Sequence, residues 1–530
     1  MIVLGVNGFF NADHDAGSCL VVDQKVVAAV EEERLGRVKR APHQDPGVSA
    51  LEVLSLGDID HQAVDVVAYP WVPEPLGLDP MREAERILQT LRARGVRLRR
   101  TVEVRFVPHH QAHAWVGLTY LPVQERHRAA VLALDGSGES TSGALFHVRE
   151  GRPTLVWHLP LESSLGAFYE GATAAIGFAW GQEGKTMGLA SYGTVVGEFP
   201  PLPTPEARRF EGPLPQLSHD YLTIVKGFAR QLTMALGEPN TFMERAKVAA
   251  FAQEHLTRSV KGLIGEADAP TIVLSGGTAL NCAMNGDMAT WLAHRGQRLV
   301  VPPPANDAGV ALGAAVAVAS EEGPVEQLDT ALLGREFTTG QIGDAMTSLG
   351  ARMADCSTEH LVDRLRAGET IGWFAGRAEI GPRALGARCV IARPDSEALR
   401  DRINVAKGRE SWRPLAPSVT SAEFERSFEG CPSRYMLKAS LVRPGAQGLR
   451  GVTHVDGTAR PQVVPPAGTY SEVVAGMGSD STPQAVICTS FNRAGEPIVY
   501  SPRHALLSAR SMGLQALAGN GWIVDLARRS

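Results

Sequence analysis

The sequence has few cysteines, and none of them is spaced to hold a metal or a disulfide framework. Six cysteines occur in 530 residues, and no C-x-x-C pair is present. This argues against a cysteine zinc site and against a small disulfide-stabilised fold. We therefore expect reduced thiols and a cytoplasmic protein.

The sequence also lacks a secretory leader, a long apolar run and an excess of basic charge. The first residues, MIVLGVNGFF, contain no basic region and no small-residue cleavage site. Charged residues interrupt the apolar runs before they reach the roughly 20 residues that a membrane span needs. The net charge is −5 and the pI is near 6.3, so there is no chain-wide basic surface. We expect a protein that binds neither membrane nor nucleic acid.

No P-loop and no dinucleotide fingerprint is present, since neither G-x-x-x-x-G-K-[ST] nor G-x-G-x-x-G occurs. The sequence instead alternates strand-like and helix-like runs over roughly 330 residues, which predicts an α/β architecture with helices packed on sheets. Residues 129–134 and 271–274 have the length and composition of buried strands. Helical patterns begin at 279 and cover 309–319.

Two strand-to-glycine turns and a predicted N-terminal hairpin indicate a duplicated nucleotide-binding domain. The hairpin comprises strands at 19–22 and 26–30. The chain becomes more polar around 320–350, and we place a boundary there between domains at 1–345 and 346–530. The proline-rich stretch at 195–216 predicts a surface loop.

A His-x3-His pair at His109 and His113 lies in the segment PHHQAHAW. On a helix, positions i and i+4 share a face, so both imidazoles could reach one metal ion while His110 points elsewhere. Two surface histidines would show the same spacing. Asp135 and Asp307 are placed where α/β sheets build sites, at the carboxyl ends of strands. Two histidines and two aspartates suit iron, manganese or zinc.

Glycine-rich turns follow two predicted strands, at 136–138 and 276–278. Glycine lets the backbone approach a ligand closely, so that its N–H groups can hold phosphate or ribose. An ordinary tight turn would use the same glycines. Lys185, between Gly184 and Gly188, could reach a phosphate as a point charge.

An arginine-rich stretch, GRAEIGPRALGAR, spans 376–388 and continues with Asn404, Lys407, Arg409 and the run WRP at 412–414. Arginine forks match the oxygens of phosphate and carboxylate. Glycine and proline between the arginines argue against a plain solvated helix face. The lack of interleaved aromatic residues argues against nucleic acid. We predict a small phosphorylated anion as the ligand.

The turn Asp13-His14-Asp15 places a histidine between two carboxylates. Such a histidine can act as a general base near neutral pH. A turn histidine that only makes local hydrogen bonds is the alternative.

Ordered motifs occur along nearly the whole chain. They are His14-Asp15, EEER at 31–34, HHQAHA at 109–114, LDGSGE at 134–139, SLGAFYEG at 164–171, GKTMGLASYG at 184–193, LSGGTALNC at 274–282, NDAGVALGAA at 306–315, GRAEIGPRALGAR at 376–388, VTHVDGTARPQVV at 452–464 and TSFNRAGEPIV at 489–499. Together they resemble the carbamoyltransferase family that includes nodulation-factor and antibiotic O-carbamoyltransferases.

The resemblance implies a fold and a set of site residues. The fold is an actin-like ATPase (ASKHA) domain, similar to that of tRNA threonylcarbamoyl-transferases, followed by a YrdC-like domain. The implied ligands of a divalent metal, with Fe²⁺ expected ahead of Mn²⁺ or Zn²⁺, are His109, His113, Asp135 and Asp307. The implied adenylate-binding residues are Gly138, Glu170, Gly171, Lys185, Gly276, Gly277 and Asn281. The implied carbamoyl phosphate-binding residues are Arg383, Arg388, Lys407, Arg413 and Arg493.

The resemblance also implies a two-step reaction. ATP with Mg²⁺ and carbamoyl phosphate would give carbamoyl-adenylate, with release of phosphate and pyrophosphate. A hydroxyl of a small-molecule acceptor, an antibiotic or a sugar, would then attack the carbamoyl carbon, with His14 as general base. The alternative is a tRNA threonylcarbamoyladenosine-type modification enzyme, which would use threonine and bicarbonate. A homodimer is left open.

Overall fold

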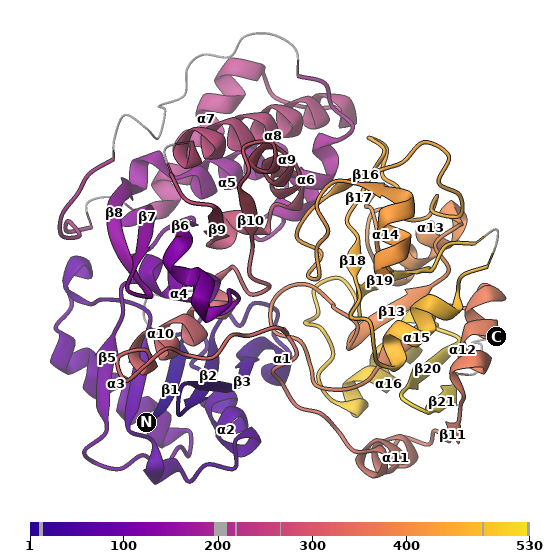
Figure 1. The fold of residues 1–530 in the computed structure, drawn as a ribbon, viewed down its shortest axis with the longest axis horizontal. Coiled ribbons are helices and arrows are strands. Elements are labelled where there is room, and N and C mark those ends of the chain that lie inside the picture. Colours follow the sequence, from indigo (N-terminus) through magenta and orange to yellow (C-terminus); the bar gives the residue numbers. More distant parts are fainter. Residues whose placement is uncertain (10–13, 196–208, 218–219, 266, 480–481, 527–530) are drawn as a thin grey trace. The chain divides into compact units, whose positions relative to one another are not determined.

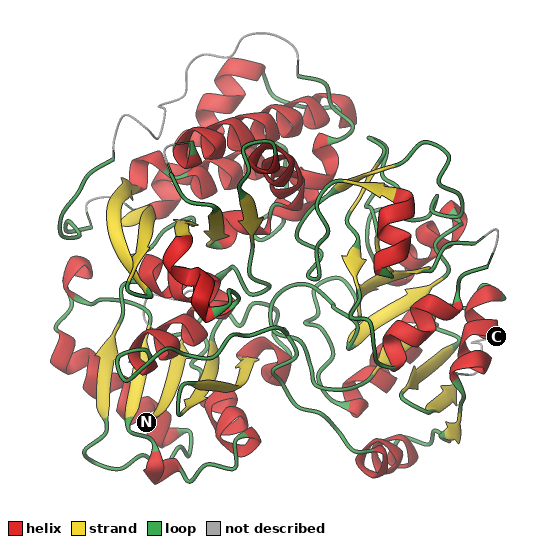
Figure 2. Ribbon diagram, in the orientation of Figure 1, coloured by secondary structure: helices red, strands yellow, loops and turns green. Residues whose placement is uncertain are grey.

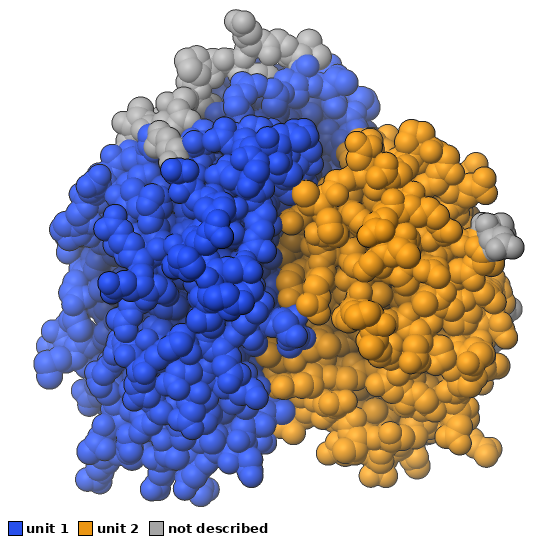
Figure 3. Space-filling view, viewed as in Figure 1, with its two compact units in different colours: residues 1–32, 40–330 blue, residues 33–39, 331–530 orange. Residues whose placement is uncertain are grey.

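The computed structural model describes residues 1–9, 14–195, 209–217, 220–265, 267–479 and 482–526 (Figure 1). These form two compact units (Figure 3). Unit 1 contains residues 1–32 and 40–330, and unit 2 contains residues 33–39 and 331–530. The chain therefore passes from unit 1 into unit 2 between residues 330 and 331. The boundary expected from the sequence is at residue 345. Most of the proline-rich stretch at 195–216 lies outside the described residues.

Unit 1 is built on two five-stranded sheets with the same topology. The orders are β3-β2-β1-β4-β5 and, reversed, β8-β7-β6-β9-β10. In each sheet three strands form an antiparallel meander, and two further strands continue parallel to the first strand of that meander. The repeated order and directions confirm the predicted duplication. The strands are β1 (Ile2–Asn7), β2 (Gly17–Val22), β3 (Lys25–Glu31), β4 (Val66–Tyr69), β5 (Glu103–Phe106), β6 (Ala129–Leu134), β7 (Thr141–Arg149), β8 (Arg152–Pro160), β9 (Thr271–Ser275) and β10 (Arg298–Val300).

Helices cover the two sheets of unit 1, as Figure 2 shows. The described α-helices are α2 (Gly47–Leu56), α3 (Pro80–Ala93), α4 (His109–Thr119), α5 (Leu165–Ala175), α6 (Glu183–Ala190), α7 (Tyr221–Leu236), α8 (Phe242–Ile264), α9 (Cys282–Ala293) and α10 (Val310–Ala319). Short 3₁₀ turns are η1 (His61–Ala63), η2 (Glu74–Leu76), η3 (Val123–Arg128), η4 (Leu161–Ser163), η6 (Gly277–Leu280) and η7 (Asp307–Gly309).

Helices α4 and α10 pack against each other and bring together the elements that carry the candidate site. Every residue of β6 is buried, as expected for a strand covered on both faces. Gly313 of α10 lies so close to α4 that a Cβ there would be 2.0 Å from the Ala112 carbonyl oxygen. Only glycine allows this approach, and it fixes η7, at the start of α10, relative to the first turn of α4.

Unit 2 contains an eight-stranded mixed sheet of order β11-β21-β20-β12-β13-β19-β14-β18 and a small sheet of order β15-β16-β17. The strands are β11 (Ala354–Asp355), β12 (Ile371–Phe374), β13 (Arg388–Ala392), β14 (Ala416–Val419), β15 (Phe428–Glu429), β16 (Ser440–Val442), β17 (Thr458–Ala459), β18 (Gln462–Val463), β19 (Ala485–Ser490), β20 (Ala516–Gly519) and β21 (Trp522–Asp525). The helices are α11 (Thr339–Ser348), α12 (Thr358–Arg366), α13 (Glu397–Ala406), α14 (Ser421–Ser427), α15 (Thr469–Gly476) and α16 (Pro502–Met512). The whole is a mixed α/β architecture, as predicted.

Residues 33–39 follow β3 and the start of α1 (Glu32–Gly36) but belong to unit 2. Buried Arg34 donates from Nη2 to the Gly381 carbonyl at 2.7 Å. Arg37 donates to the carbonyls of Pro497 at 2.8 Å and Ile498 at 2.7 Å. Side chains from the first forty residues thus satisfy backbone acceptors in loops more than 340 residues away.

Candidate metal centre and anion site

His109 and His113 lie one turn apart on α4, and both side chains are fully buried. Their Nε2 atoms are 3.1 Å apart. His110 points elsewhere, and its Nδ1 lies 3.1 Å from the Thr141 hydroxyl. The i, i+4 spacing therefore places the two imidazoles together, as the sequence predicts.

Two aspartates complete the cluster from the ends of other elements. Asp135 directly follows β6, and Asp307 begins η7. His113 Nε2 lies 2.8 Å from Asp135 Oδ2 and 3.3 Å from Asp307 Oδ1. His109 Nε2 lies 3.8 Å and 3.5 Å from the same two oxygens. One ligand atom from each residue falls within 4.8 Å of all the others.

The chemistry of these four groups fits a metal ion. Two imidazole nitrogens 3.1 Å apart can share at most one proton. Asp135 Oδ2 is buried and accepts no hydrogen bond of regular geometry from a described residue. Burial alone would lower the pKa of His109, but the carboxylates of Asp307 and Asp135 outweigh it and raise that pKa to about 10. A cation is thus favoured here, and two nitrogens with two carboxylate oxygens suit Fe²⁺, Mn²⁺ or Zn²⁺.

A second layer of contacts fixes the orientation of His109. Its Nδ1 lies 3.3 Å from the Pro70 carbonyl, which leaves Nε2 to face the cluster. Its backbone N–H donates at 2.9 Å to the carboxylate of buried Glu139. The ring of Trp71 packs against the imidazole with centroids 4.0 Å apart. The sequence analysis did not single out Glu139 or Trp71 as site residues, although Glu139 lies in the motif LDGSGE and Trp71 follows the end of β4.

His14 and Asp15 lie next to this cluster of candidate metal ligands. His14 Nδ1 is 3.2 Å from Asp15 Oδ2, and that carboxylate also accepts a 2.9 Å hydrogen bond from Asn306, the neighbour of Asp307. Burial lowers the pKa of His14, but Asp15 outweighs this effect and raises the pKa to about 9. His14 is therefore protonated at neutral pH in the ligand-free protein. Asp13 lies outside the described residues.

The predicted adenylate residues occupy the loops and helices around this cluster. A Cβ on Gly277 would lie 2.9 Å from Asp135 Oδ1, and one on Gly138 would lie 2.6 Å from the His110 ring. Gly276 has φ +90° and packs on the Leu134 carbonyl. Asn281 exchanges two hydrogen bonds with Gln253, at 2.8 Å and 3.1 Å. These glycines have clear packing reasons, and their contact with adenylate stays a prediction.

The remaining predicted adenylate residues lie on α5 and α6. Gly171 lets α5 pack on α7, since a Cβ there would lie 2.8 Å from the Phe228 Cβ. Lys185 lies over the Phe178 ring at 5.2 Å. Glu170 accepts a 2.7 Å hydrogen bond from Tyr221, whose hydroxyl packs on Gly136, beside Asp135. Tyr221 was not predicted, because it opens a helix that carries no motif.

Unit 2 contains a cluster of four partly buried arginines, two of which, Arg409 and Arg413, lie in the loop after α13. Burial, together with Arg413 and Arg460, lowers the pKa of Arg409 to about 9, and Arg383 adds to the effect. The buried Nε of Arg409 has no hydrogen-bond partner among the described residues. Gathering four guanidinium groups costs free energy unless an anion joins them. Of the residues that the resemblance implies, Arg383 and Arg413 belong to this cluster. Arg409 belongs to the predicted arginine-rich stretch but not to that implied set, and Arg460, in the motif at 452–464, belongs to neither.

The other three predicted residues differ in their surroundings. Arg388 is fully buried; its Nη atoms donate to four backbone carbonyls, and it stacks on Phe374 at 3.8 Å. Lys407 is also buried, and its Nζ donates to the carbonyls of Ser490 and Asn492. Arg493 is exposed. Arg388 and Lys407 thus stabilise the neighbouring loops through hydrogen bonds to backbone carbonyls. Direct contact of Arg388, Lys407 or Arg493 with an anion stays a prediction.

Comparison with known proteins places the chain in a family. A model of the carbamoyltransferase N-terminus matches residues 82–316, and one of the carbamoyltransferase C-terminus matches residues 362–525. Nodulation protein NolNO of Sinorhizobium fredii is 31% identical over 96% of this chain and 79% of its own length. This chain belongs to the carbamoyltransferase family. It is a carbamoyl-transferring enzyme, and the family expected from its sequence motifs is confirmed.

Two further relatives differ in how much they share. The 3'-hydroxymethylcephem-O-carbamoyltransferase of Amycolatopsis lactamdurans is 34% identical over 47% of this chain and 48% of its own length. Component A of (R)-2-hydroxyglutaryl-CoA dehydratase from Acidaminococcus fermentans, a solved structure, is 15% identical, covers 61% of this chain and 98% of its own, and has a TM-score of 0.37. Among the described residues, no helix is both long and apolar enough to cross a bilayer.

Proposed function

We propose that this carbamoyltransferase moves the carbamoyl group of carbamoyl phosphate onto a hydroxyl of a small-molecule natural product, by way of carbamoyl-adenylate made from ATP. The observation that carries the proposal is a pair of differently charged sites. Unit 1 has a nitrogen-and-carboxylate cluster suited to a metal ion, and unit 2 has a cation cluster suited to a phosphorylated anion. The first step needs a phosphate-binding site, and the second needs a site that holds a nucleotide beside a hydroxyl group.

The cation cluster serves the first step. Water attacks the carbonyl carbon of carbamoyl phosphate and loses its protons to solvent, the bond from that carbon to the bridging oxygen breaks, and carbamate and phosphate result. A carbamate oxygen then attacks the α-phosphorus of ATP, and pyrophosphate leaves. Arg409, Arg413 and Arg383 stabilise the negative charge of the departing phosphate. Lys407 and Arg388 hold the surrounding backbone in place, because their donors are bonded to carbonyls.

The cluster of unit 1 serves the second step. The acceptor hydroxyl attacks the carbamoyl carbon, its proton passes to neutral His14, and the C–O bond to AMP breaks. His109, His113, Asp135 and Asp307 would hold the metal ion, which supplies Lewis acidity when bound. Asp15 orients the His14 ring, and Glu139 and the Pro70 carbonyl orient His109.

The test is pyrophosphate and AMP release by the purified protein. We expect both products with ATP, carbamoyl phosphate and a pool of hydroxyl acceptors. The proposal is wrong if that mixture gives neither product while ATP, threonine and bicarbonate give pyrophosphate. That result would favour the tRNA-modifying alternative.

A further inference from the structure

Trp180 is the one exposed tryptophan of this protein. All eight tryptophans lie within the described residues; five are buried, and Trp291 and Trp412 are half-buried. Trp180 is 46% exposed. A single exposed apolar side chain is ordinary by itself, so the surroundings of this ring decide what it means.

The Trp180 ring is held in place by charged neighbours. The Arg40 guanidinium carbon lies 4.5 Å from the ring centroid, and the His14 ring lies 5.0 Å away. Cation–π contact of this kind stabilises the arrangement of the two side chains. Trp180 sits in the turn between α5 and α6, where Gly177 and Gly181 adopt positive φ. The ring therefore has defined contacts on a turn and still exposes part of its aromatic surface.

The Trp180 ring is connected to the His109, His113, Asp135 and Asp307 cluster through a chain of contacts. His14, which packs on Trp180, lies 3.2 Å from Asp15. Asp15 accepts a hydrogen bond from Asn306, next to the ligand candidate Asp307. The exposed ring and the proposed general base are thus immediate neighbours, at a distance that one ring-shaped molecule can span.

We propose that Trp180 is the acceptor platform and that the acceptor carries a sugar ring. The C–H face of the sugar stacks on the exposed indole surface, and a hydroxyl of the same ring reaches His14. Arg40 and His14, which both pack on the ring, border the platform with hydrogen-bonding groups. Hydroxyls of a sugar can bond to such groups, whereas a purely apolar ring would only desolvate them. The transfer of a carbamoyl group to this sugar rests on the proposed function, whereas the binding of the sugar to Trp180 does not.

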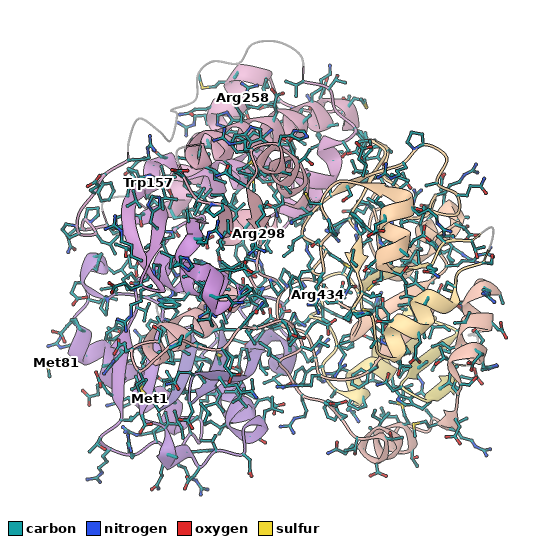
Figure 4. All side chains as sticks on the ribbon, viewed as in Figure 1. Met1, Met81, Trp157, Arg258, Arg298 and Arg434 are labelled. Atoms are coloured by element: carbon teal, nitrogen blue, oxygen red, sulfur yellow. The ribbon has the colours of Figure 1, made fainter. Side chains whose placement is uncertain are left out.

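Saturation-transfer NMR with methyl β-glucopyranoside tests the binding without any reaction. In this sugar H1, H3 and H5 share one face, and we expect the strongest transfer to them. Trp180→Ala should reduce the transfer at least fivefold, and Trp180→Phe should retain part of it. The matched control is Met81→Ala, because Met81 is an 83% exposed apolar side chain that projects from α3 (Figure 4). Equal transfer in wild type and Trp180→Ala, or none in wild type, would overturn the proposal.

Kinetics separate the sugar from the adenine of ATP as the stacked group. We expect Trp180→Ala to leave the KM for ATP within a factor of about two in the pyrophosphate assay. A tenfold higher KM for ATP with unchanged sugar binding would mean that the ring stacks adenine and would overturn the platform. Failure of the wild type to release pyrophosphate would refute the proposed function alone and leave the NMR result standing.

Discussion

His113 Nε2 and Asp135 Oδ2 lie 2.8 Å apart, although one belongs to the middle of a helix and the other follows the end of a strand. The pair defines the centre of the metal candidate site, because Asp307 and His109 approach the same nitrogen. Substitution of either residue should therefore lower the amount of metal that the protein binds.

His113→Ala should reduce bound metal from about one ion per chain to less than a tenth, because it removes one of the four candidate protein ligands. The measurement is metal analysis by mass spectrometry after gel filtration. The matched control is His127→Ala, since His127 is an exposed histidine of the same unit. Unchanged stoichiometry in His113→Ala would contradict the assignment.

The rate of carbamoyl transfer should rise with pH until about 9. The pKa of His14 is raised to about 9, so the ring is protonated below that pH and cannot accept a proton. We expect kcat/KM for the acceptor to increase by about tenfold per pH unit well below the pKa and to level off above it. His14→Asn should lower the plateau by about 100-fold and remove the inflection. A wild-type inflection near 6.5 would show that Asp15 does not raise this pKa.

Inorganic phosphate should stabilise the protein through Arg409. An anion bound only to the folded state raises Tm, and the rise grows with concentration. Arg409→Met should at least halve the phosphate-induced rise, while the Tm without phosphate stays equal or increases, because a buried and repelled charge is gone. Arg402→Ala, at an exposed position of α13, is the control. A full phosphate response in Arg409→Met would exclude Arg409 as an anion ligand.

Lys407→Met should lower stability by about 1–3 kcal/mol, because the Ser490 and Asn492 carbonyls lose their buried donor. If Lys407 only braces this loop, the phosphate-induced rise in Tm persists from the lower baseline. Thermal scans with and without phosphate measure both quantities. Loss of the phosphate response at an unchanged baseline would instead identify Lys407 as a direct ligand.

Sequence reasoning worked best where one local rule was enough. Helix periodicity brought His109 to His113, and the rule that sites lie at strand ends indicated Asp135 and Asp307. Arg460 was not predicted as part of the anion site, because it follows β17 and lies 51 residues after Arg409. Only the folded arrangement of distant strands shows that Arg460 and Arg409 are close. Trp180 escaped notice for a different reason: no spacing rule distinguishes an exposed tryptophan from a buried one.

The segment 33–39 has a practical consequence for anyone who divides this protein. A fragment that begins at 331 lacks Arg34 and Arg37, and the carbonyls of Gly381, Pro497 and Ile498 lose their donors. A fragment that ends at 330 retains an arginine-rich stretch whose acceptors are on the other piece. The two units are therefore not interchangeable modules, and a split or chimeric gene must carry 33–39 together with the second half.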